Sequence, residues 1–457
     1  MIEDPMKQLR QRAHVAIEST ADLAGRVERL AGKEADKRAK EEKGEIPRKP
    51  SLIPLAPAAH RHGMATTPWE LLHTLGRATV LAGQNPSRGI SQHWNYLRYL
   101  TTLQSNHHGR MELSANGKHP RYHRKSVQAQ DLGTAFALRA AREVLSRTAP
   151  GHHFEVVDAE VALEAGWALR GKESKGSHHT RTRPGYFIVG RKANGPLRLV
   201  IVECRGTHGR ANMQLEQLAR AAERVHAVAL DGGPAPSLLM STTLAAEGGI
   251  AIGVLDPPGD GILQGAGAPV PDLTGPVEQL NAFPQIPQPT NDGKPGIRSG
   301  FNIPAADYEW FSRVLVRTAA AGVLAFVGDR ESAGHYLTAR QQSRLGDDYS
   351  QHATNAECDV HVSLGGTELV GTDHVFRFDR RRVEVFSGVP KVLHTLLARD
   401  KDLSSYLEET PRAFKQWTDR SAEVESDWGG VVSMGADGTV MGLRWLNEGR
   451  QELKSTQ

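Results

Sequence analysis

The stretch LRLVIVECRG, residues 197–206, points most directly to the fold. Its apolar run, rich in β-branched residues, predicts a strand buried on both faces, as at the centre of a sheet. Regular patterns surround it. They predict helices over 126–147 and 212–229, and strands over 154–161, 186–192, 237–243 and 250–256. We therefore expect an α/β core with the element order α-β-β-β-α-β.

This order, with a central strand that ends in Glu203-Cys204-Arg205, resembles the PD-(D/E)XK (restriction-endonuclease-like) nuclease superfamily over roughly residues 126–255. The resemblance implies an αβββαβ core and magnesium-dependent cleavage of a phosphodiester. Magnesium prefers carboxylate oxygens as ligands, and residues two apart on a strand face the same way. The resemblance thus makes Glu203 a metal ligand and puts Arg205 in the place of the family's lysine. Gln214, in the next helix, would orient substrate or water.

Two departures from the family pattern bear on catalysis. Arginine stays protonated, so Arg205 can stabilise charge but is a poor base. The family's first acid usually follows a proline, and here Pro184 precedes Gly185, which has no side chain to bind metal. Asp158, in the preceding strand, is the nearest substitute. The expected catalytic residues are Glu203, Arg205, Asp158 and Gln214, with Asp158 and Glu203 as ligands of Mg²⁺.

Positive charge is concentrated around this pattern. Residues 161–210 hold ten Lys/Arg against three Asp/Glu, which is a plausible footprint for a phosphate backbone. A flexible polar loop over 170–183 is an equally open interpretation. The predicted nucleic-acid contacts are Arg181, Arg183, His178, His179, Arg210 and Lys125.

Two functions follow as hypotheses. The first is a magnesium-dependent DNA endonuclease, a hydrolase acting in defence or repair. The second is a catalytically degenerate nuclease-like module that binds nucleic acid or a partner protein as a subunit of a larger assembly. The missing acid at Gly185 and the arginine at 205 favour the second. A third reading, a structural subunit whose basic loop meets an acidic protein, also stays open.

The rest of the 457 residues divides by composition. Leu9, Ala16, Leu23 and Leu30 recur every seven residues and predict a helix, which could join a second copy or a partner protein. Thr67 and Pro68 predict the start of another helix. The expected parts are an N-terminal helix (1–45), a linker (46–66), a helical and basic segment (67–125), the nuclease-like core (126–255), a Pro/Gly-rich linker (256–300) and a separate α+β C-terminal domain (301–457).

Several function classes have no support in the sequence. No run of 18 apolar residues predicts a membrane span, and the N-terminus does not read as a secretory signal. Two cysteines are too few for a disulfide framework, so a cytoplasmic protein is expected. Phosphate-binding-loop, serine-hydrolase and zinc-protease motifs do not occur. The histidines of 105–125 are spaced too closely for a His-Asn-His nuclease.

Overall fold

The computed structural model describes most of the chain. Described are residues 5–41, 48–49, 51–81, 93–118, 121–169, 183–192, 195–209, 211–245, 248–256, 261–264, 272–289, 295–345 and 356–446. The predicted contacts Arg181, His178, His179 and Arg210 lie outside these ranges. Among the described helices, none is long and apolar enough to cross a membrane.

The fold is mixed α/β and is built on a seven-stranded sheet of order β2-β1-β11-β10-β7-β6-β5. Its strands are β2 (Met64–Thr66), β1 (Ala13–Glu18), β11 (Ile250–Leu255), β10 (Ser237–Leu244), β7 (Arg198–Thr207), β6 (Tyr186–Arg191) and β5 (His153–Asp158). β5, β6 and β7 pair antiparallel in sequence order, and β10 lies parallel to β7. The run at 198–207 is therefore a central strand, as its apolar sequence predicts.

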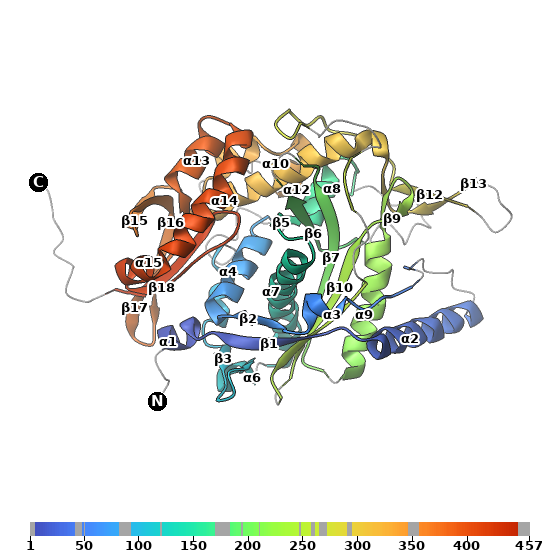
Figure 1. Cartoon of the computed structure of the whole chain (residues 1–457), viewed down its shortest axis with the longest axis horizontal. Helices are drawn as coiled ribbons and strands as arrows, with labels where there is room; N and C mark the ends of the chain where they lie inside the picture. The colour runs from blue at the N-terminus through green and yellow to red at the C-terminus, as the bar shows by residue number, and fades with distance from the viewer. Residues whose placement is uncertain are drawn as a thin grey trace, which may run out of the picture.

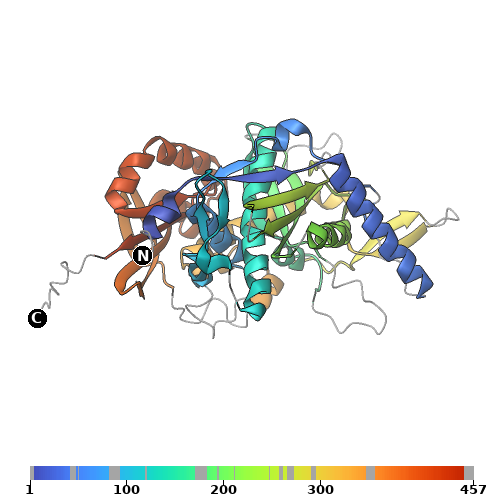
Figure 2. The ribbon, with the colours of Figure 1, turned by 90° about the horizontal axis from the view of Figure 1, so that it is seen from below.

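Two helices cover opposite faces of β7. α7 (Tyr122–Thr148) crosses β7 at Gly206, and Gly133 of the helix lies against this glycine. The approach is so close that a Cβ on Gly206 would lie 2.0 Å from the Ala129 carbonyl oxygen. α9 (Ala211–His226) covers the other face, and its Arg224 reaches Glu203. Figure 2 shows α7 and α9 on the two sides of the strands.

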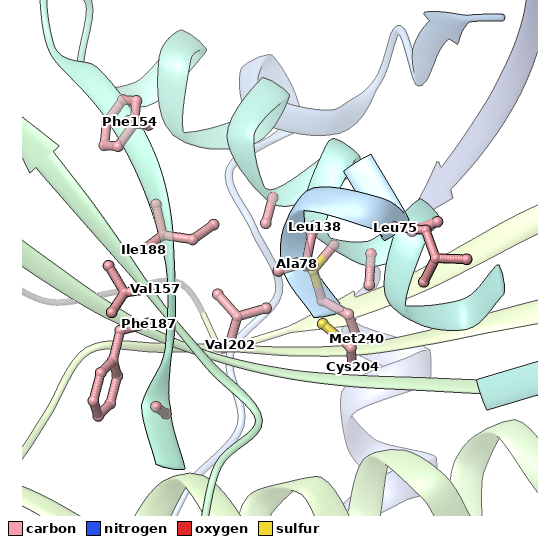
Figure 3. Close-up of a cluster of buried hydrophobic side chains, with 14 of the residues drawn as sticks. Leu75, Ala78, Leu138, Phe154, Val157, Phe187, Ile188, Val202, Cys204 and Met240 are labelled. Atoms are coloured by element: carbon pink, nitrogen blue, oxygen red, sulfur yellow. The ribbon is translucent and has the colours of Figure 1, made fainter. Parts of the chain in front are cut away.

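The core packs α4 (Pro68–Thr79) and α7 against the sheet. Thr67 caps α4 in a reciprocal capping box with Glu70, and Pro68 occupies the first turn, as predicted. Figure 3 shows Leu75, Ala78 and Leu138 of these helices together with Val202, Cys204 and Met240 of the sheet. Each of them is buried. Burial also raises the pKa of the Cys204 thiol, so this cysteine belongs to the core.

The N-terminal segment differs from the single helix expected over 1–45. It forms α1 (Pro5–Arg10), β1 and α2 (Ala21–Lys40), and β1 pairs in parallel with β11. Ala13, Val15 and Ile17 are buried in alternation, so pairing with a distant strand overrides the seven-residue spacing. The apolar stripe of α2 packs within the chain, beside α9 (Figure 1).

Both predicted linkers contain regular structure. Residues 46–66 include α3 (Pro57–His60) and β2, an edge strand of the sheet. Within 256–300, β12 (Gln285–Pro289) and β13 (Pro295–Ser299) pair as a two-stranded ribbon. Prolines are tolerated there because edge strands leave backbone groups unpaired. The segment expected to be helical and basic over 67–125 also contains a 3-10 helix, η2 (Asn95–Tyr99), and the strands β3 (Leu103–Ser105) and β4 (Met111–Leu113), which pair before the short helix α6 (Ala115–Lys118).

Small elements join the sheet to the C-terminal part. β8 (Val228–Leu230) pairs with β9 (Gly233–Pro234) and with β14 (Phe301–Ile303), and a 3-10 turn η4 (Ala305–Asp307) leads into the buried helix α10 (Tyr308–Phe326). Two short helices, α11 (Arg330–Gly334) and α12 (Ala339–Leu345), follow it.

The C-terminal part forms its own antiparallel sheet of order β15-β16-β17-β19-β18. Its strands are β15 (Val360–Leu364), β16 (Thr367–Phe378), β17 (Arg381–Pro390), β18 (Gly430–Met434) and β19 (Val440–Trp445), and its helices are α13 (Lys391–Ala398), α14 (Leu403–Asp419) and α15 (Ser421–Trp428). The main buried cluster runs from Met6 to Leu443, and Trp69 donates a 2.9 Å hydrogen bond to the Met441 carbonyl. The C-terminal part therefore shares the core of the rest of the chain.

Candidate functional site

The candidate site is centred on Glu203, near the carboxyl end of β7. Its side chain is only 2% exposed. Alternation along the strand puts Glu203 and Arg205 on the face covered by α9, and Val202 and Cys204 on the face covered by α7. The predicted pair Glu203 and Arg205 therefore does share one face.

The Glu203 carboxylate is surrounded by donors. Its Oε1 lies 2.7 Å from Nη2 of Arg205 and 3.3 Å from Nη1 of Arg224. Its Oε2 accepts a 2.9 Å hydrogen bond from the backbone N–H of Gly185. We call Glu203, Arg205, Arg224 and Gly185 the Glu203 cluster. Both carboxylate oxygens are thus occupied by the protein's own groups.

The electrostatics of the cluster combine burial with two positive charges. Burial raises the pKa of Glu203, while Arg205, Arg224 and the Gly185 N–H act in the opposite direction. Burial also lowers the pKa of Arg224, but a guanidinium remains protonated at any physiological pH. One carboxylate between two guanidiniums leaves an excess of one positive charge when Glu203 is ionised. The two arginine side chains are 22% and 43% exposed, so they face solvent while Glu203 does not.

Gly185 occupies the place where the resemblance expects the first acid. It lies directly beside Glu203, because a Cβ added there would be 3.8 Å from Oε2, an ordinary van der Waals contact. Its backbone is not among the glycines with positive φ. The position could therefore carry a side chain, and neither the backbone conformation nor the available space requires a glycine there.

Asp158 is not brought to Glu203. Asp158 pairs with Tyr186, and Tyr186 pairs with Val202, so the register puts Asp158 on the Val202 face of the sheet. Its carboxylate accepts a 2.9 Å hydrogen bond from the N–H of Val161 and caps α8 (Ala159–Glu164). The strand expected over 154–161 therefore ends at Asp158, because this residue starts a helix.

The residues of the expected magnesium site do not fit the ion. Magnesium needs near-octahedral oxygen ligands. Here Oε1 of Glu203 faces two guanidiniums and Oε2 faces a backbone N–H, Gly185 offers no side chain, and Asp158 lies across the sheet. Over the described ranges, no group of three or more His, Cys, Asp or Glu side chains could hold a metal.

Gln214 has a structural role in joining α9 to the sheet. It is buried, and its amide donates a 3.1 Å hydrogen bond to the Ser241 carbonyl in β10. Gln217, one turn later, donates to the Gly206 carbonyl at 2.8 Å and accepts from the Ser241 hydroxyl at 2.7 Å. Both glutamines fasten α9 to the carboxyl ends of β7 and β10, and in this way they set the position of Arg224.

Arg183 and Lys125, the two predicted nucleic-acid contacts within the described residues, differ in whether their charge is paired. Arg183 lies 3.0 Å from Glu160, and both side chains are partly buried, so this arginine is neutralised. Lys125 is exposed in the first turns of α7. Of the predicted nucleic-acid contacts within the described ranges, Lys125 is thus the one that faces solvent.

Sequence reasoning missed Arg224, although a signal was present. Gln214, Gln217 and Arg224 are three and ten residues apart, so they share one face of α9. Once Gln217 packs against β7, Arg224 lies over the same strand two turns later. No protein-family model, curated protein or solved structure matches the chain.

Proposed function

We propose that this chain is a nuclease-like module with a restriction-endonuclease-like αβββαβ core that no longer cleaves and instead binds the phosphate backbone of nucleic acid. One observation carries the proposal: the Glu203 carboxylate lies between Arg205 and Arg224 and next to Gly185. Cations of the protein itself would then take over the role of a metal ion at this position.

The element order supports the assignment of the core. α7, β5, β6, β7, α9 and β10 follow one another along the chain, and β10 is parallel to β7. The helices on the two faces of β7 complete a layered arrangement. This supports the resemblance over 126–255, without supporting the chemistry that the family performs.

The charge of the Glu203 cluster supports binding. Arg205 and Arg224 are partly exposed and share a single buried carboxylate. A guanidinium binds phosphate oxygens in a bidentate manner, and contacts of this kind release counterions, which makes affinity fall steeply with salt. Lys125, exposed on α7, adds charge near the same end of the sheet: burial lowers the pKa of His208, just after β7, and the charge of Lys125 adds to that shift. DNA is the first ligand to test.

The test is fluorescence anisotropy with labelled double- and single-stranded DNA and RNA at several salt concentrations. The test variant combines Arg205→Met, Arg224→Met and Glu203→Gln, so that no buried charge is left unpaired. The control is Arg26→Met, which removes an exposed arginine from α2. We expect the test variant to bind at least tenfold more weakly with a smaller salt slope, and the control to bind like the wild type.

The same samples are incubated with plasmid DNA and Mg²⁺, Mn²⁺ or chelator. We expect no cleavage by the wild type. Metal-dependent cleavage that is lost in Glu203→Gln would overturn the proposal in favour of the magnesium-dependent endonuclease, with Glu203 and Asp158 as its metal ligands. Absence of any salt-dependent nucleic-acid binding would overturn it in favour of a protein partner.

A further inference from the structure

A polar cavity lies away from the Glu203 cluster, where the N-terminal, central and C-terminal segments meet. Its volume is about 150 Å³, and no member of the Glu203 cluster lines it. A cavity of this size accommodates a molecule about as large as benzene. Its wall is formed by α4, α7, β5, the tip of the β18–β19 hairpin, and Phe414 of α14.

The ionisable side chains of the wall are almost all paired. The pairs, with their nitrogen–oxygen distances, are Arg77–Asp437 (2.7 Å), Arg139–Glu143 (3.6 Å), Arg191–Glu155 (2.5 Å) and Arg12–Glu70 (3.3 Å). In each pair at least one partner lines the cavity. Each positive charge in these pairs is balanced by a carboxylate.

His73 contributes no charge to the wall at neutral pH. Its two ring nitrogens lie 2.9 Å from the Ser433 hydroxyl and 3.1 Å from the Thr439 hydroxyl, which ties α4 to the β18–β19 hairpin. Burial lowers the pKa of His73 to about 4; Asp437 and Glu70 oppose this shift, whereas Arg142 and Arg77 add to it. The imidazole is therefore neutral and serves to hold the wall together.

Arg142 is the exception. It lines the cavity from α7, yet within the described residues it has no hydrogen-bond or ion-pair partner. Burial lowers the pKa of Arg142, and the two carboxylates that oppose this shift, Asp437 and Glu155, are already paired with Arg77 and Arg191. The Arg142 side chain is partly exposed, and even partial withdrawal of a guanidinium from water is unfavourable when it has no partner. The wall holds three arginines and three carboxylates, and Arg142 is the arginine among them without a carboxylate of its own.

We propose that this cavity binds a small oxyanion, a single phosphate, sulfate or carboxylate group, with Arg142 as its ion-pair partner. Arg142 presents a fork of N–H donors that matches such a group in shape and charge. Arg139, one helical turn earlier on α7, adds a second guanidinium whose own carboxylate is 3.6 Å away. The bound anion would join α7 to α4 and to the β18–β19 hairpin, and so stabilise the contact between the C-terminal sheet and the core.

The proposal does not depend on nucleic-acid binding at the Glu203 cluster. The test is thermal unfolding of the full chain in titrations with sodium phosphate, sulfate and acetate, with sodium chloride keeping the ionic strength constant. The variant is Arg142→Met, and Arg26→Met is the matched control. A ligand that binds only the folded protein raises the unfolding temperature with a saturable concentration dependence.

We expect at least one of the three anions to raise the unfolding temperature of the wild type and of Arg26→Met, and Arg142→Met to lose at least tenfold in apparent affinity. In buffer that contains only chloride, Arg142→Met should unfold at a higher temperature than the wild type, because it lacks the unpaired charge. If Arg142→Met does not fold, Arg142→Gln replaces it with the same expected loss of affinity. A response equal to that of chloride, or an unchanged response in the variant, would overturn the proposal.

Discussion

The backbone N–H of Gly185 donates a 2.9 Å hydrogen bond to Oε2 of Glu203. This contact brings the start of β6 and the end of β7 together at one point of the sheet. A metal-dependent nuclease needs two acids at such a point, whereas this chain has one acid and a glycine. The neighbouring cations, Arg205 and Arg224, contact the other carboxylate oxygen of Glu203, so both oxygens are occupied by groups of the protein.

A second carboxylate at position 185 should create a metal site. In Gly185→Asp combined with Arg205→Lys, the new side chain starts 3.8 Å from Oε2 of Glu203, and one competing guanidinium is gone. We expect calorimetric binding of Mn²⁺ at submillimolar concentration, because two adjacent carboxylates favour a divalent cation. Gly185→Asn with Arg205→Lys has the same shape without the charge and should not bind. Equal heats from the two variants would contradict this prediction.

Removal of the charge of Glu203 should lower the stability of the fold and raise the affinity for nucleic acid. Glu203→Gln keeps an acceptor for the Gly185 N–H but leaves Arg205 and Arg224 without their anion. We expect the free energy of unfolding in urea to fall by about 2 kcal/mol, as for a lost charge-assisted hydrogen bond. Nucleic-acid affinity at low salt should rise severalfold, because two guanidiniums become free for phosphate. A loss of affinity in a folded variant would show that the carboxylate itself contacts the ligand.

The close contact between α7 and β7 should not tolerate a side chain. In Gly206→Ala the new Cβ would lie 2.0 Å from the Ala129 carbonyl oxygen and 2.9 Å from Cα of Gly133. We expect a loss of about 3 kcal/mol or more in urea unfolding, since the helix must move away from a packed sheet. Gly32→Ala is the control: no atom lies within 4 Å of its Cβ, and it should stabilise α2 by about 0.5–1 kcal/mol.

Stability should decrease in mild acid because of a buried histidine. His93 is 8% exposed, packs against Trp94 and Phe326, and has its pKa lowered to about 3 by burial, with a smaller effect of Arg330. Between about pH 6.5 and pH 3, the unfolded chain binds this proton and the folded chain does not. The contribution of His93 to the free energy of unfolding is therefore fully present above pH 6.5. It is lost at about 1.4 kcal/mol per pH unit below that.

The measurement is urea unfolding at pH 7.0, 6.0 and 5.0 for the wild type and His93→Gln. His73 and His226 also have lowered pKa values and steepen the slope in both proteins, so the variant should lose only the one proton's worth that His93 contributes. Among the described residues, Nε2 of His93 has no hydrogen-bond partner, so glutamine breaks no described bond of that atom. Parallel pH profiles for the two proteins would exclude His93 as the source.

Local patterns in the sequence determined most of the core. The apolar run of β7, the strands β6, β10 and β11, and the helices α7 and α9 form close to where the pattern predicts them, and β5 forms over the first part of its predicted range. Apolar periodicity is a local property, and burial of one face is enough to specify each element. The proximity of Glu203 and Arg205 follows in the same way from the period of a strand.

Only the tertiary structure decided which groups meet. β1 joins the sheet by pairing with β11, more than 230 residues later in the chain, and β2 joins it by pairing with β1. Asp158 and Glu203 lie on opposite faces because of strand register, and Arg224 reaches Glu203 because Gln217 fixes α9. The cavity at Arg142 combines side chains from residues 70 to 439. Such contacts depend on strand register and on packing between distant segments. The hydrophobic periodicity of a single helix or strand carries no information about either.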